Sequence, residues 1–590
     1  MYRAPVEEIA FTLKHVAGLK AVLDDGRFGD LSEDLVDAVL AEAGRFASDE
    51  VAPLARIGDM QGAKLSDAAV TMPDGWKALY ARWTDGGWNG LSGPEEFGGQ
   101  GLPAMLGVAA LEMWNSASMA FALGPTLTMG AVEAIDKHGT DALKATYLAK
   151  LVSGEWMGTM NLTEPQAGSD LNALRARAEP AGDGSYRVFG QKIFITFGEH
   201  DFTDNIVHLV LARLPDAPPG TRGISLFLVP KFLVNEDGTL GARNDVFCAS
   251  MEHKLGIHGS PTCTMIYGDG FDGNEPGAVG YLIGEENRGL ACMFTMMNNA
   301  RLAIGMQGVA IAEAAYQKAL AYAQDRRQGR APGYTGEGMS PIVLHPDVQR
   351  SLLTMKAMTS AARGIAYCCA HATDMARTGE GDQARHWQER ANLLTPIAKA
   401  FSTDIGVDMA SIGLQIHGGM GFIEETGAAV LYRDARIAPI YEGTNGIQAI
   451  DLVMRKLPQS GGAHVLDYIG ELRAEAEAVR ASNLAGFGRT ADRLDAALDD
   501  LEAATRSLQA MSSAGRASEA LAGATPYLRL FGLAAGGALL ARGAVAGKDA
   551  GRIALARFFA ENLISECAAL RDRVENGAGS LEAAAVELAV

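Results

Sequence analysis

The spacing of hydrophobic residues changes its period along this chain. After Ser32, a candidate helix N-cap, helical spacing places six apolar side chains on one face: Leu35, Val36, Val39, Leu40, Ala43 and Phe46. Residues 69–102 are rich in Gly, Pro and Trp, which predicts a loop. Helical spacing returns over about 105–152, with a break at Gly139 and a second candidate cap at Thr140.

Beyond Glu155 the apolar residues recur at every second position. Two such runs are Val207, Leu209 and Leu211, and Ile224, Leu226 and Leu228. Alternation of this kind is typical of β-strands, so we predict a compact β unit, a small barrel or sandwich, over roughly 158–284. From Gly289 to about Leu457 the helical period is held, with short breaks near 329–341 and 418–427. This stretch predicts a bundle of long helices.

These changes of period predict a multidomain protein, mainly α-helical with a central β domain. The predicted parts are an N-terminal extension (1–30), a helical domain (31–157), a β domain (158–284), a helical bundle domain (285–457) and a C-terminal helical domain (466–590). A linker that reads PQSGGAHV separates the last two. A length of 590 residues also requires several domains.

Composition narrows the classes of protein. The formal net charge of −20, and acid-rich text such as DRLDAALDDLEAA near the C-terminus, argue against nucleic acid as a partner. The six cysteines form no CxxC pair and no metal-ligand spacing, which predicts no metal site and a reducing, cytoplasmic location. Pro5, Glu7 and Glu8 are unlike a signal peptide. The apolar run between Arg529 and Arg542 is too short to span a membrane, so we expect no membrane association.

One candidate catalytic group is Glu442, in the segment IYEGTNGIQ. Its neighbours Ile440 and Tyr441 are apolar and Gly443 follows, so the carboxylate is expected to be partly desolvated. Desolvation raises the pKa of a carboxyl group and makes its anion a stronger base. Taken alone, the segment is more typical of a surface turn followed by a helix N-cap at Thr444.

Other segments carry groups suited to a large polar ligand. The loop MNLTEPQAGSDL offers the hydroxyls of Thr163 and Ser169, and the strand GQKIFITFG offers Phe194 as a flat platform and Thr196 as a donor. Each has an ordinary structural alternative: a turn for the loop and a core position for the aromatic ring. A GxGxxA pattern begins at Gly99, but no strand precedes it, which excludes a Rossmann site there. No GxSxG, HExxH or P-loop motif occurs.

Two segments of the predicted bundle could approach phosphate or sugar groups. Arg326 and Gln328 lie near a helix end in YAQDRRQGR, and an arginine fork can bind pyrophosphate. Gly418 and Gly419, in LQIHGGMGF, allow close approach of bare backbone. A solvated helix end and a helix C-cap are the alternatives.

Six motifs in this order resemble the acyl-CoA dehydrogenase flavoproteins: MNLTEPQAGSD, GQKIFITFG, MEHKLGIHGSP, YAQDRRQ, QIHGGMGF and IYEGTNGIQ. The resemblance covers about 31–457 and implies FAD bound between the β domain and the bundle, with its adenosine end reaching a second subunit. The implied cofactor contacts are Met160, Leu162, Thr163, Phe194 and Thr196 at the flavin ring, Arg326 and Gln328 of the partner subunit at the pyrophosphate, Gln415, Gly418 and Gly419 near the adenosine, and Thr444 and Gly446 at the flavin. Phe194 replaces a frequent Trp, and Gly446 replaces a common Gln.

The same resemblance implies the reaction. Glu442 matches the catalytic base, and Ala300 occupies the position where some relatives carry the base instead. Substrate contacts are implied at four positions: Ser169, Asn298, Arg301 and Gly443. The implied product is a trans-2-enoyl-CoA, and the implied electron acceptor is an electron-transfer flavoprotein.

The N-terminal extension and the helical tail resemble a branch of the family that acts on short thioether acyl chains, and the tail implies a homodimer. A dehydrogenase for straight-chain fatty acyl-CoA, a nucleic-acid-binding flavoprotein and an oxidase are the alternatives.

Overall fold

Two long helices, α6 (Ala104–His138) and α8 (Gly289–Asp325), each contribute residues to two compact units of the chain. The computed structural model describes residues 2–26, 28–29 and 31–588, apart from the side chain of Asn298. Unit 1 comprises Met1–Arg45, Pro103–Ser116 and Arg301–Val590, and unit 2 comprises Phe46–Leu102 and Ala117–Ala300. Ser118 interrupts α6 with extended backbone angles (φ −160°, ψ 100°), two residues beyond the point where the units divide.

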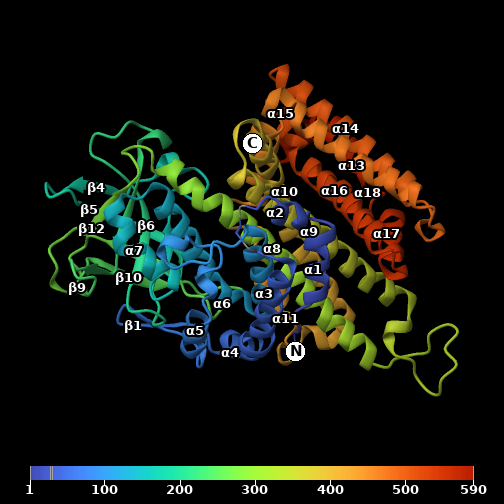
Figure 1. Cartoon of the computed structure of the whole chain (residues 1–590), viewed down its shortest axis with the longest axis horizontal. Helices are drawn as coiled ribbons and strands as arrows, with labels where there is room; N and C mark the ends of the chain where they lie inside the picture. Colours follow the sequence, from blue (N-terminus) through green and yellow to red (C-terminus); the bar gives the residue numbers. More distant parts are fainter. Residues whose placement is uncertain (1, 27, 30, 589–590) are drawn as a thin grey trace. The chain divides into compact units, whose positions relative to one another are not determined.

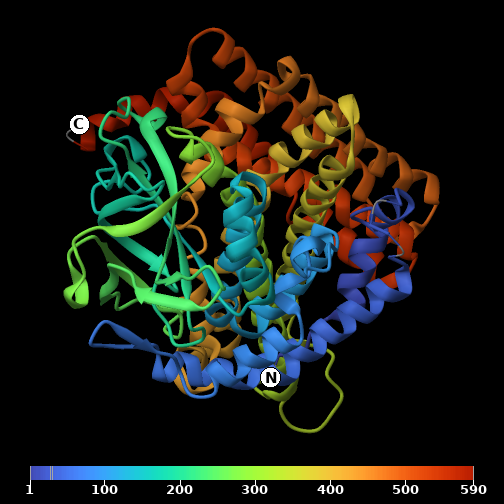
Figure 2. The same ribbon diagram turned by 60° about the vertical axis from the view of Figure 1, so that its left-hand side comes forward.

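An eight-stranded mixed sheet forms the β part of unit 2, and its strands are clearest in Figure 2. Its members are β3 (Met157–Asn161), β4 (Arg177–Pro180), β5 (Tyr186–Thr196), β6 (Ile206–Arg213), β7 (Ile224–Pro230), β10 (Val246–Met251), β11 (Thr262–Tyr267) and β12 (Ala278–Ile283). The long strand β5 pairs with β4 and β12 before Gly190 and with β11 from Gly190 onward. Gly190 has φ +133°, which glycine adopts at little cost, so β5 joins two halves of the sheet at this point.

The central strands differ from simple alternation. Every residue of β7, and every residue of β6 except Arg213, is buried, so both faces of these strands are covered. The apolar alternation therefore located the strands correctly but does not mark an exposed face. A short hairpin, β8 (Phe232–Val234) with β9 (Leu240–Arg243), completes the predicted β region.

The segment predicted to be a loop, 69–102, contains regular structure. β1 (Lys64–Ser66) pairs with β2 (Ala69–Thr71), and α5 (Trp76–Asp85) follows. Trp76, Tyr80 and Trp83 have helical spacing and are buried, and the rings of Trp76 and Trp83 meet Phe121 edge-on at 5.6 and 6.0 Å. The loop prediction was wrong here because aromatic packing outweighs the turn-rich composition around the helix. α4 (Ala52–Gln61) precedes the hairpin, and α7 (Asp141–Ser153) begins after Thr140, which accepts from Leu143 N at 3.3 Å as expected of a cap.

Unit 1 contains the predicted bundle. Its helices are α3 (Glu33–Phe46, its last residue assigned to unit 2), the C-terminal part of α8, α9 (Pro346–Thr378), α10 (Gly381–His417), α11 (Ala428–Ala435) and α12 (Asn445–Asp451). Ser32 Oγ caps α3 by accepting from Leu35 N at 3.3 Å, but the Leu35 side chain is 47% exposed and does not join the buried face. On α8, a Cβ at Gly308 would lie 2.1 Å from the carbonyl oxygen of Ser402, so glycine is required for α8 and α10 to pack this closely.

The helices of the C-terminal region lie side by side in unit 1 (Figure 1). They are α13 (Ala463–Ser482), α14 (Thr490–Ser513), α15 (Ala517–Ala522), α16 (Ala524–Gly547), α17 (Ala550–Asn562) and α18 (Glu566–Ala584). α13 begins inside the segment predicted to be a linker. In the described part of the chain, α6 and α16 are long and apolar enough to cross a membrane, but their most apolar windows are 89% and 72% buried within the protein. The run between Arg529 and Arg542 thus belongs to a longer core helix.

The predicted N-terminal extension forms two helices, α1 (Val6–His15) and α2 (Leu19–Asp24). Residues of this extension contact two helices of the C-terminal region, α16 and α17. Arg552 on α17 donates to both carboxylate oxygens of Glu8 at 2.7 Å, and its guanidinium lies 3.4 Å from the centre of the Phe11 ring. Arg542 on α16 donates to the Val16 carbonyl at 2.9 Å. Residues near the N-terminus and residues of the C-terminal region therefore pack against each other within unit 1.

A buried ionic cluster links three helices of unit 1. Arg363 on α9 donates to Glu112 on α6 at 2.6 and 2.8 Å and to Glu313 on α8 at 2.9 Å, and the hydroxyl of Tyr367 donates to Glu112 at 2.5 Å. The side chains of Arg363 and Glu112 are 1% and 0% exposed. One guanidinium therefore compensates two carboxylates in the interior of unit 1.

Candidate active site

Glu442 lies in the short connection between α11 and α12 with a left-handed backbone, φ +55°. Such a φ is unfavourable for a side-chain-bearing residue and persists where the surrounding contacts impose it. Gln448 on α12 donates to the Glu442 carbonyl at 3.1 Å, and Thr444 caps α12 by accepting from Ile447 N at 3.4 Å. Gly443 also has a positive φ, +83°, and a Cβ there would lie 2.9 Å from the Gln448 amide. The turn is therefore held in one strained shape.

The surroundings of Glu442 change its acidity. Its side chain is half-buried, and burial raises the pKa of Glu442 to about 7, while Arg301 and Lys399 act in the opposite direction. This is the direction expected from its apolar neighbours. Tyr441 donates its hydroxyl to Gln307, so the residue before Glu442 is also anchored in the bundle. At neutral pH such a carboxyl group can both accept and release a proton readily.

Lys399 on α10 is a polar group next to this turn that the sequence interpretation did not single out. Its side chain is fully buried, and its ammonium donates to the Gly443 carbonyl and to Asn445 Oδ1, both at 2.9 Å. Burial lowers the pKa of Lys399 to about 7, and the carboxylates of Glu442 and Asp404 oppose this shift. The available signal was a lysine inside an otherwise apolar helical stretch, PIAKAF.

Arg301, predicted to contact substrate, lies in the same unit as Glu442. It is 7% exposed, and its guanidinium lies 3.6 Å from Asp451 on α12. Burial lowers the pKa of Arg301, while Asp451 and Glu442 raise it. Unit 1 therefore brings Arg301, Glu442, Gly443 and Thr444 together, with Gly446 exposed in the first turn of α12.

In unit 2, Phe194 has two features that are unusual for an aromatic residue on a strand. Its backbone has φ +60° and its side chain is 58% exposed. The pairing register between β5 and β11 shifts at this point, so a bulge turns the ring away from the sheet. An exposed, strained aromatic ring costs stability, which is typical of residues held for ligand contact.

Contacts within unit 2 bring the other predicted ring-contact residues next to Phe194. Ile193 N donates to the Thr163 carbonyl at 2.9 Å, which joins β5 to the segment that carries Met160, Leu162 and Thr163. Thr196 pairs with Thr262 at the end of the strand. Ser169, predicted to contact substrate, is exposed in the loop that follows Thr163. The side chain of Asn298 lies outside the described residues.

Glu164 holds this loop, a role that the sequence interpretation missed. It forms a buried ion pair with Lys192 on β5 at 2.8 Å, and it accepts from the backbone N–H groups of Arg175 and Ala176 at 2.7 and 3.0 Å. These partners keep the pKa of Glu164 low in spite of its burial. The acid of the TEPQAGSD motif therefore holds the loop to β5 and to the backbone of residues 175–176.

The remaining predicted cofactor residues lie at the ends of two bundle helices of unit 1. Arg326 and Gln328 follow α8, and the end of α10 carries Gln415, Gly418 and Gly419; all five are exposed. Tyr322 on α8 and His417 on α10 stack with ring centroids 4.5 Å apart, which joins the two ends. The described part of the chain provides no hydrogen-bond or ion-pair partner for the Arg326 side chain, whereas Arg330 donates to three carbonyl groups of the loop after it. Phe422, just beyond the glycines, is 90% exposed.

Among the described residues, no group of three or more His, Cys, Asp or Glu side chains could hold a metal ion. The groups that the described residues do offer are a carboxyl group in a strained turn (Glu442), an exposed aromatic ring (Phe194) and an arginine side chain with no partner among them (Arg326).

The fold and these motifs define an acyl-CoA dehydrogenase, and the chain belongs to this family. It matches the N-terminal domain of acyl-CoA dehydrogenase over residues 34–155, the middle domain over 159–269 and the C-terminal domain over 287–457. Residues 468–585 match the domain described as acetyl-CoA dehydrogenase C-terminal like. The protein is thus an oxidoreductase that dehydrogenates acyl-CoA, with an added helical domain.

One similar protein is the 3-methylmercaptopropionyl-CoA dehydrogenase of Ruegeria pomeroyi, 47% identical over 98% of this chain and 99% of that protein. In fold, the chain is similar to Caenorhabditis elegans ACDH-11 in complex with C11-CoA, with a TM-score of 0.78, 20% identity and coverage of 96% and 92% of the two chains. It is also similar to an acyl-CoA dehydrogenase of Bacillus anthracis complexed with FAD, with a TM-score of 0.72, 21% identity and coverage of 93% and 89%.

Proposed function

We propose that this protein is a cytoplasmic, FAD-dependent dehydrogenase that converts 3-methylmercaptopropionyl-CoA to its trans-2-enoyl-CoA, a step in dimethylsulfoniopropionate breakdown, and passes the electrons to an electron-transfer flavoprotein. The observation that best supports the proposed dehydrogenation is the strained, half-buried Glu442 with a pKa raised to about 7. The choice of substrate is supported by the similarity to the Ruegeria pomeroyi enzyme, which extends over 98% of this chain and so includes the N-terminal extension and the added helical domain.

The reaction requires a base because the α C–H of a thioester is a weak acid. We propose that the Glu442 carboxylate takes the α proton while the β carbon loses a hydride, so that a C=C bond forms and two electrons leave the substrate. The backbone N–H of Glu442 is a candidate donor to the thioester carbonyl, which would stabilise the developing enolate. FAD, when bound, supplies the acceptor for the hydride.

The residues present fit FAD. Phe194 offers an exposed ring beside Met160, Leu162 and Thr163, and Thr196 offers a hydroxyl on the same strand. For the pyrophosphate, Arg326 offers a guanidinium that no described residue engages, with Gln328 nearby and Gln415, Gly418 and Gly419 on the adjoining helix end. Thr444 and Gly446 are proposed as further flavin contacts, and Ser169, Asn298, Arg301 and Gly443 as substrate contacts.

We propose a homodimer in which the helix-end group, Arg326, Gln328, Gln415, Gly418 and Gly419, binds the FAD of the partner subunit. The exposure of this group and of Phe422 supports a surface that a second copy covers. Light scattering is expected to give the mass of two chains of 62.1 kDa each, and a tetramer would contradict the proposal.

Arg326→Met is expected to weaken FAD binding about tenfold, because a charge-assisted bond to a phosphate is lost. The measurement is the dissociation constant of FAD from its fluorescence on release. Arg350→Met is the matched control, since Arg350 is an exposed arginine that is already paired, with Asp347. Equal FAD affinity in wild type and Arg326→Met would remove Arg326 from the cofactor site.

The substrate proposal is tested by anaerobic mixing of the yellow protein with 3-methylmercaptopropionyl-CoA and with straight-chain thioesters from butyryl-CoA to palmitoyl-CoA. We expect the thioether substrate to bleach the flavin with the highest kcat/KM. A clear preference for palmitoyl-CoA would instead favour a general fatty acyl-CoA dehydrogenase. Rapid peroxide formation in air would favour an oxidase.

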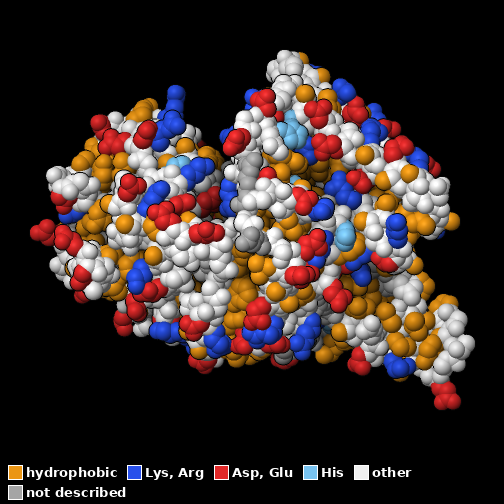
Figure 3. Space-filling view, in the orientation of Figure 1, with side chains coloured by type: hydrophobic (Ala, Val, Ile, Leu, Met, Phe, Trp, Pro, Cys, Tyr) orange, Lys and Arg blue, Asp and Glu red, His pale blue; other side chains and the backbone are white. Residues whose placement is uncertain are grey.

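Nucleic acid is not a favoured partner. On the face shown in Figure 3, acidic and basic side chains are interspersed and no continuous basic surface is seen, in keeping with the net charge of −20. A gel-shift assay at low salt is expected to show no DNA binding.

A further inference from the structure

Lys399 is a buried ammonium group that lacks an ion-pair contact among the described residues, although the carboxylates of Glu442 and Asp404 are near enough to favour its charge. Its two hydrogen-bond acceptors, the Gly443 carbonyl and Asn445 Oδ1, are both uncharged, and no described carboxylate forms an ion pair with it. Taking an ammonium group out of water costs several kcal/mol unless nearby charge offsets it. A neutral hydrogen-bond donor could hold the same two acceptors, so the charge itself calls for an explanation.

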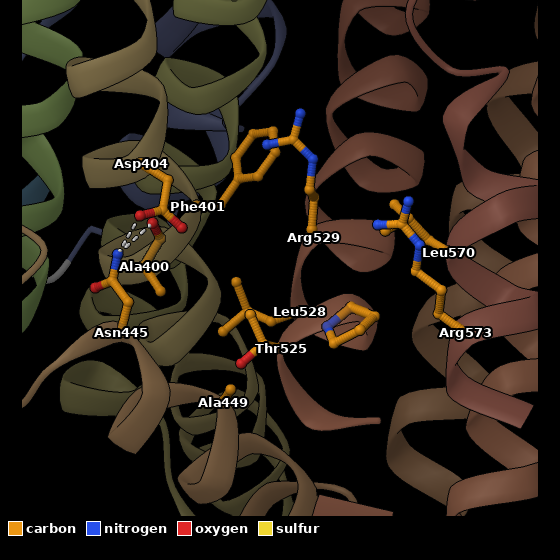
Figure 4. Close-up of a pocket in the computed structure, with 11 residues that line it drawn as sticks. Ala400, Phe401, Asp404, Asn445, Ala449, Thr525, Leu528, Arg529, Leu570 and Arg573 are labelled. Carbon is orange, nitrogen blue, oxygen red and sulfur yellow. Dashed lines mark hydrogen bonds between the residues drawn. The ribbon is translucent and has the colours of Figure 1, made fainter. Parts of the chain in front are cut away.

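Asn445 is the second half of this arrangement and lies three residues beyond Glu442. Its amide nitrogen donates to Asp404 Oδ1 at 2.7 Å, to Thr403 Oγ1 at 3.0 Å and to the Ala400 carbonyl at 3.1 Å, all on α10. Figure 4 shows Asn445 hydrogen-bonded to Asp404 and Ala400 on one side of a pocket of about 150 Å³, with Arg529 and Arg573 on the side of the C-terminal helices. The turn that carries Glu442 is thus attached to α10 at two points. Gly443 is held by Lys399, and Asn445 is held by Lys399 and by Ala400, Thr403 and Asp404.

We propose that Lys399 is a positioning residue for Glu442: its ammonium fixes the turn through Gly443 and Asn445 and favours the carboxylate form of the base. This inference rests on the proposed function of Glu442. The charge of Lys399 then serves the reaction, because it offsets the burial that would otherwise keep Glu442 protonated. A neutral side chain could hold the turn in place but could not stabilise the Glu442 carboxylate. This explains why a charged side chain is buried here in spite of its unfavourable desolvation.

The charged groups around Lys399 come from several elements. Glu442 lies in the turn, Asp404 lies about one helical turn further along α10, and Arg301 faces it from α8. Asp451 on α12 pairs with Arg301, and Arg529 on α16 acts on Asp404. Arg301 and Lys399 are the two cations that lower the pKa of Glu442. Removal of Lys399 therefore leaves one cation to stabilise the Glu442 carboxylate.

The test measures the base without hydride transfer. A 3-thia-acyl-CoA has sulfur in place of the β carbon and cannot lose a β hydride, so exchange of its α protons with D₂O, followed by mass spectrometry, reports proton removal by Glu442 alone. For wild type we expect the exchange rate to rise with pH through about 7, the pKa of Glu442. We call this rising part of the pH–rate profile the limb. For Lys399→Met we expect this limb to move to higher pH by about one unit and the rate at pH 6.5 to fall about tenfold.

Three variants separate charge from structure. Lys399→Arg keeps the charge and is expected to keep the limb near its wild-type position. Lys399→Gln keeps an N–H donor but not the charge, and is expected to shift the limb as Lys399→Met does; it replaces that variant if the Met side chain prevents folding. Thr403→Val removes one contact to Asn445 without a change of charge, and is expected to leave the limb in place whatever its effect on the rate.

An unmoved limb in both Lys399→Met and Lys399→Gln would overturn the inference and leave Lys399 a structural residue. So would an equal shift in Thr403→Val. A wild-type protein that neither exchanges α protons nor is bleached by any thioester would instead overturn the proposed function, so the two failures are distinguishable.

Discussion

Glu442→Gln is expected to lower the rate of flavin bleaching by acyl-CoA by about 10⁴-fold while the protein stays yellow. Glutamine has the shape of glutamate and can adopt the same turn, but it cannot accept the α proton. The family resemblance implies that Ala300 stands where some relatives carry the base, so we expect no second carboxylate to substitute. The measurement is anaerobic stopped-flow absorbance with the substrate that wild type prefers.

The matched control is Glu236→Gln, an exposed glutamate in the turn between β8 and β9, which should bleach as wild type does. The wild-type rate should rise with pH through about 7, because the base must be ionised and burial has raised its pKa to that value. Retention of more than a tenth of the wild-type rate in Glu442→Gln would show that another group is the base.

The second large effect concerns stability. Arg363→Met is expected to lower the free energy of unfolding of unit 1 by about 3–5 kcal/mol, because it leaves the buried carboxylates of Glu112 and Glu313 without their common cation. Urea unfolding followed by far-UV circular dichroism measures the change.

Arg480→Met provides the comparison. Arg480 also has several carboxylate partners, Glu477, Asp492 and Asp495, but lies at the surface, where water replaces the lost contacts. We expect little change in its unfolding. An equally small change in Arg363→Met would mean that the buried cluster is not important for stability.

Most of the fold followed from the sequence because hydrophobic period is a local property. The periods located the bundle helices and β5, β6 and β7, and the caps at Ser32 and Thr140 were found from residue type alone. Leu35 was misplaced because helical spacing defines a face but not which part of that face a neighbour covers. Helix α5 was missed because its stability comes from contacts of Trp76 and Trp83 with Phe121, and spacing along the chain does not reveal them.

For the site, the motif predicted Glu442 as the base, which stays a prediction, but the sequence did not reveal the residues that hold its turn in place. The positive φ of Phe194 depends on a register shift against β11, a strand that lies some seventy residues further along the chain. Lys399 reaches the Gly443 carbonyl, next to Glu442, only because α10 packs beside the turn, 44 residues away in sequence. The domain boundaries and the roles of individual site residues remain predictions.

The ion pair between Glu8 and Arg552 joins positions 544 residues apart. α1 also contacts α9 and α16. During synthesis α1 leaves the ribosome long before α16 and α17 exist, so these contacts of α1 are completed only late in translation. A chain that stops before α16 would lack them, and this part of α1 would stay exposed.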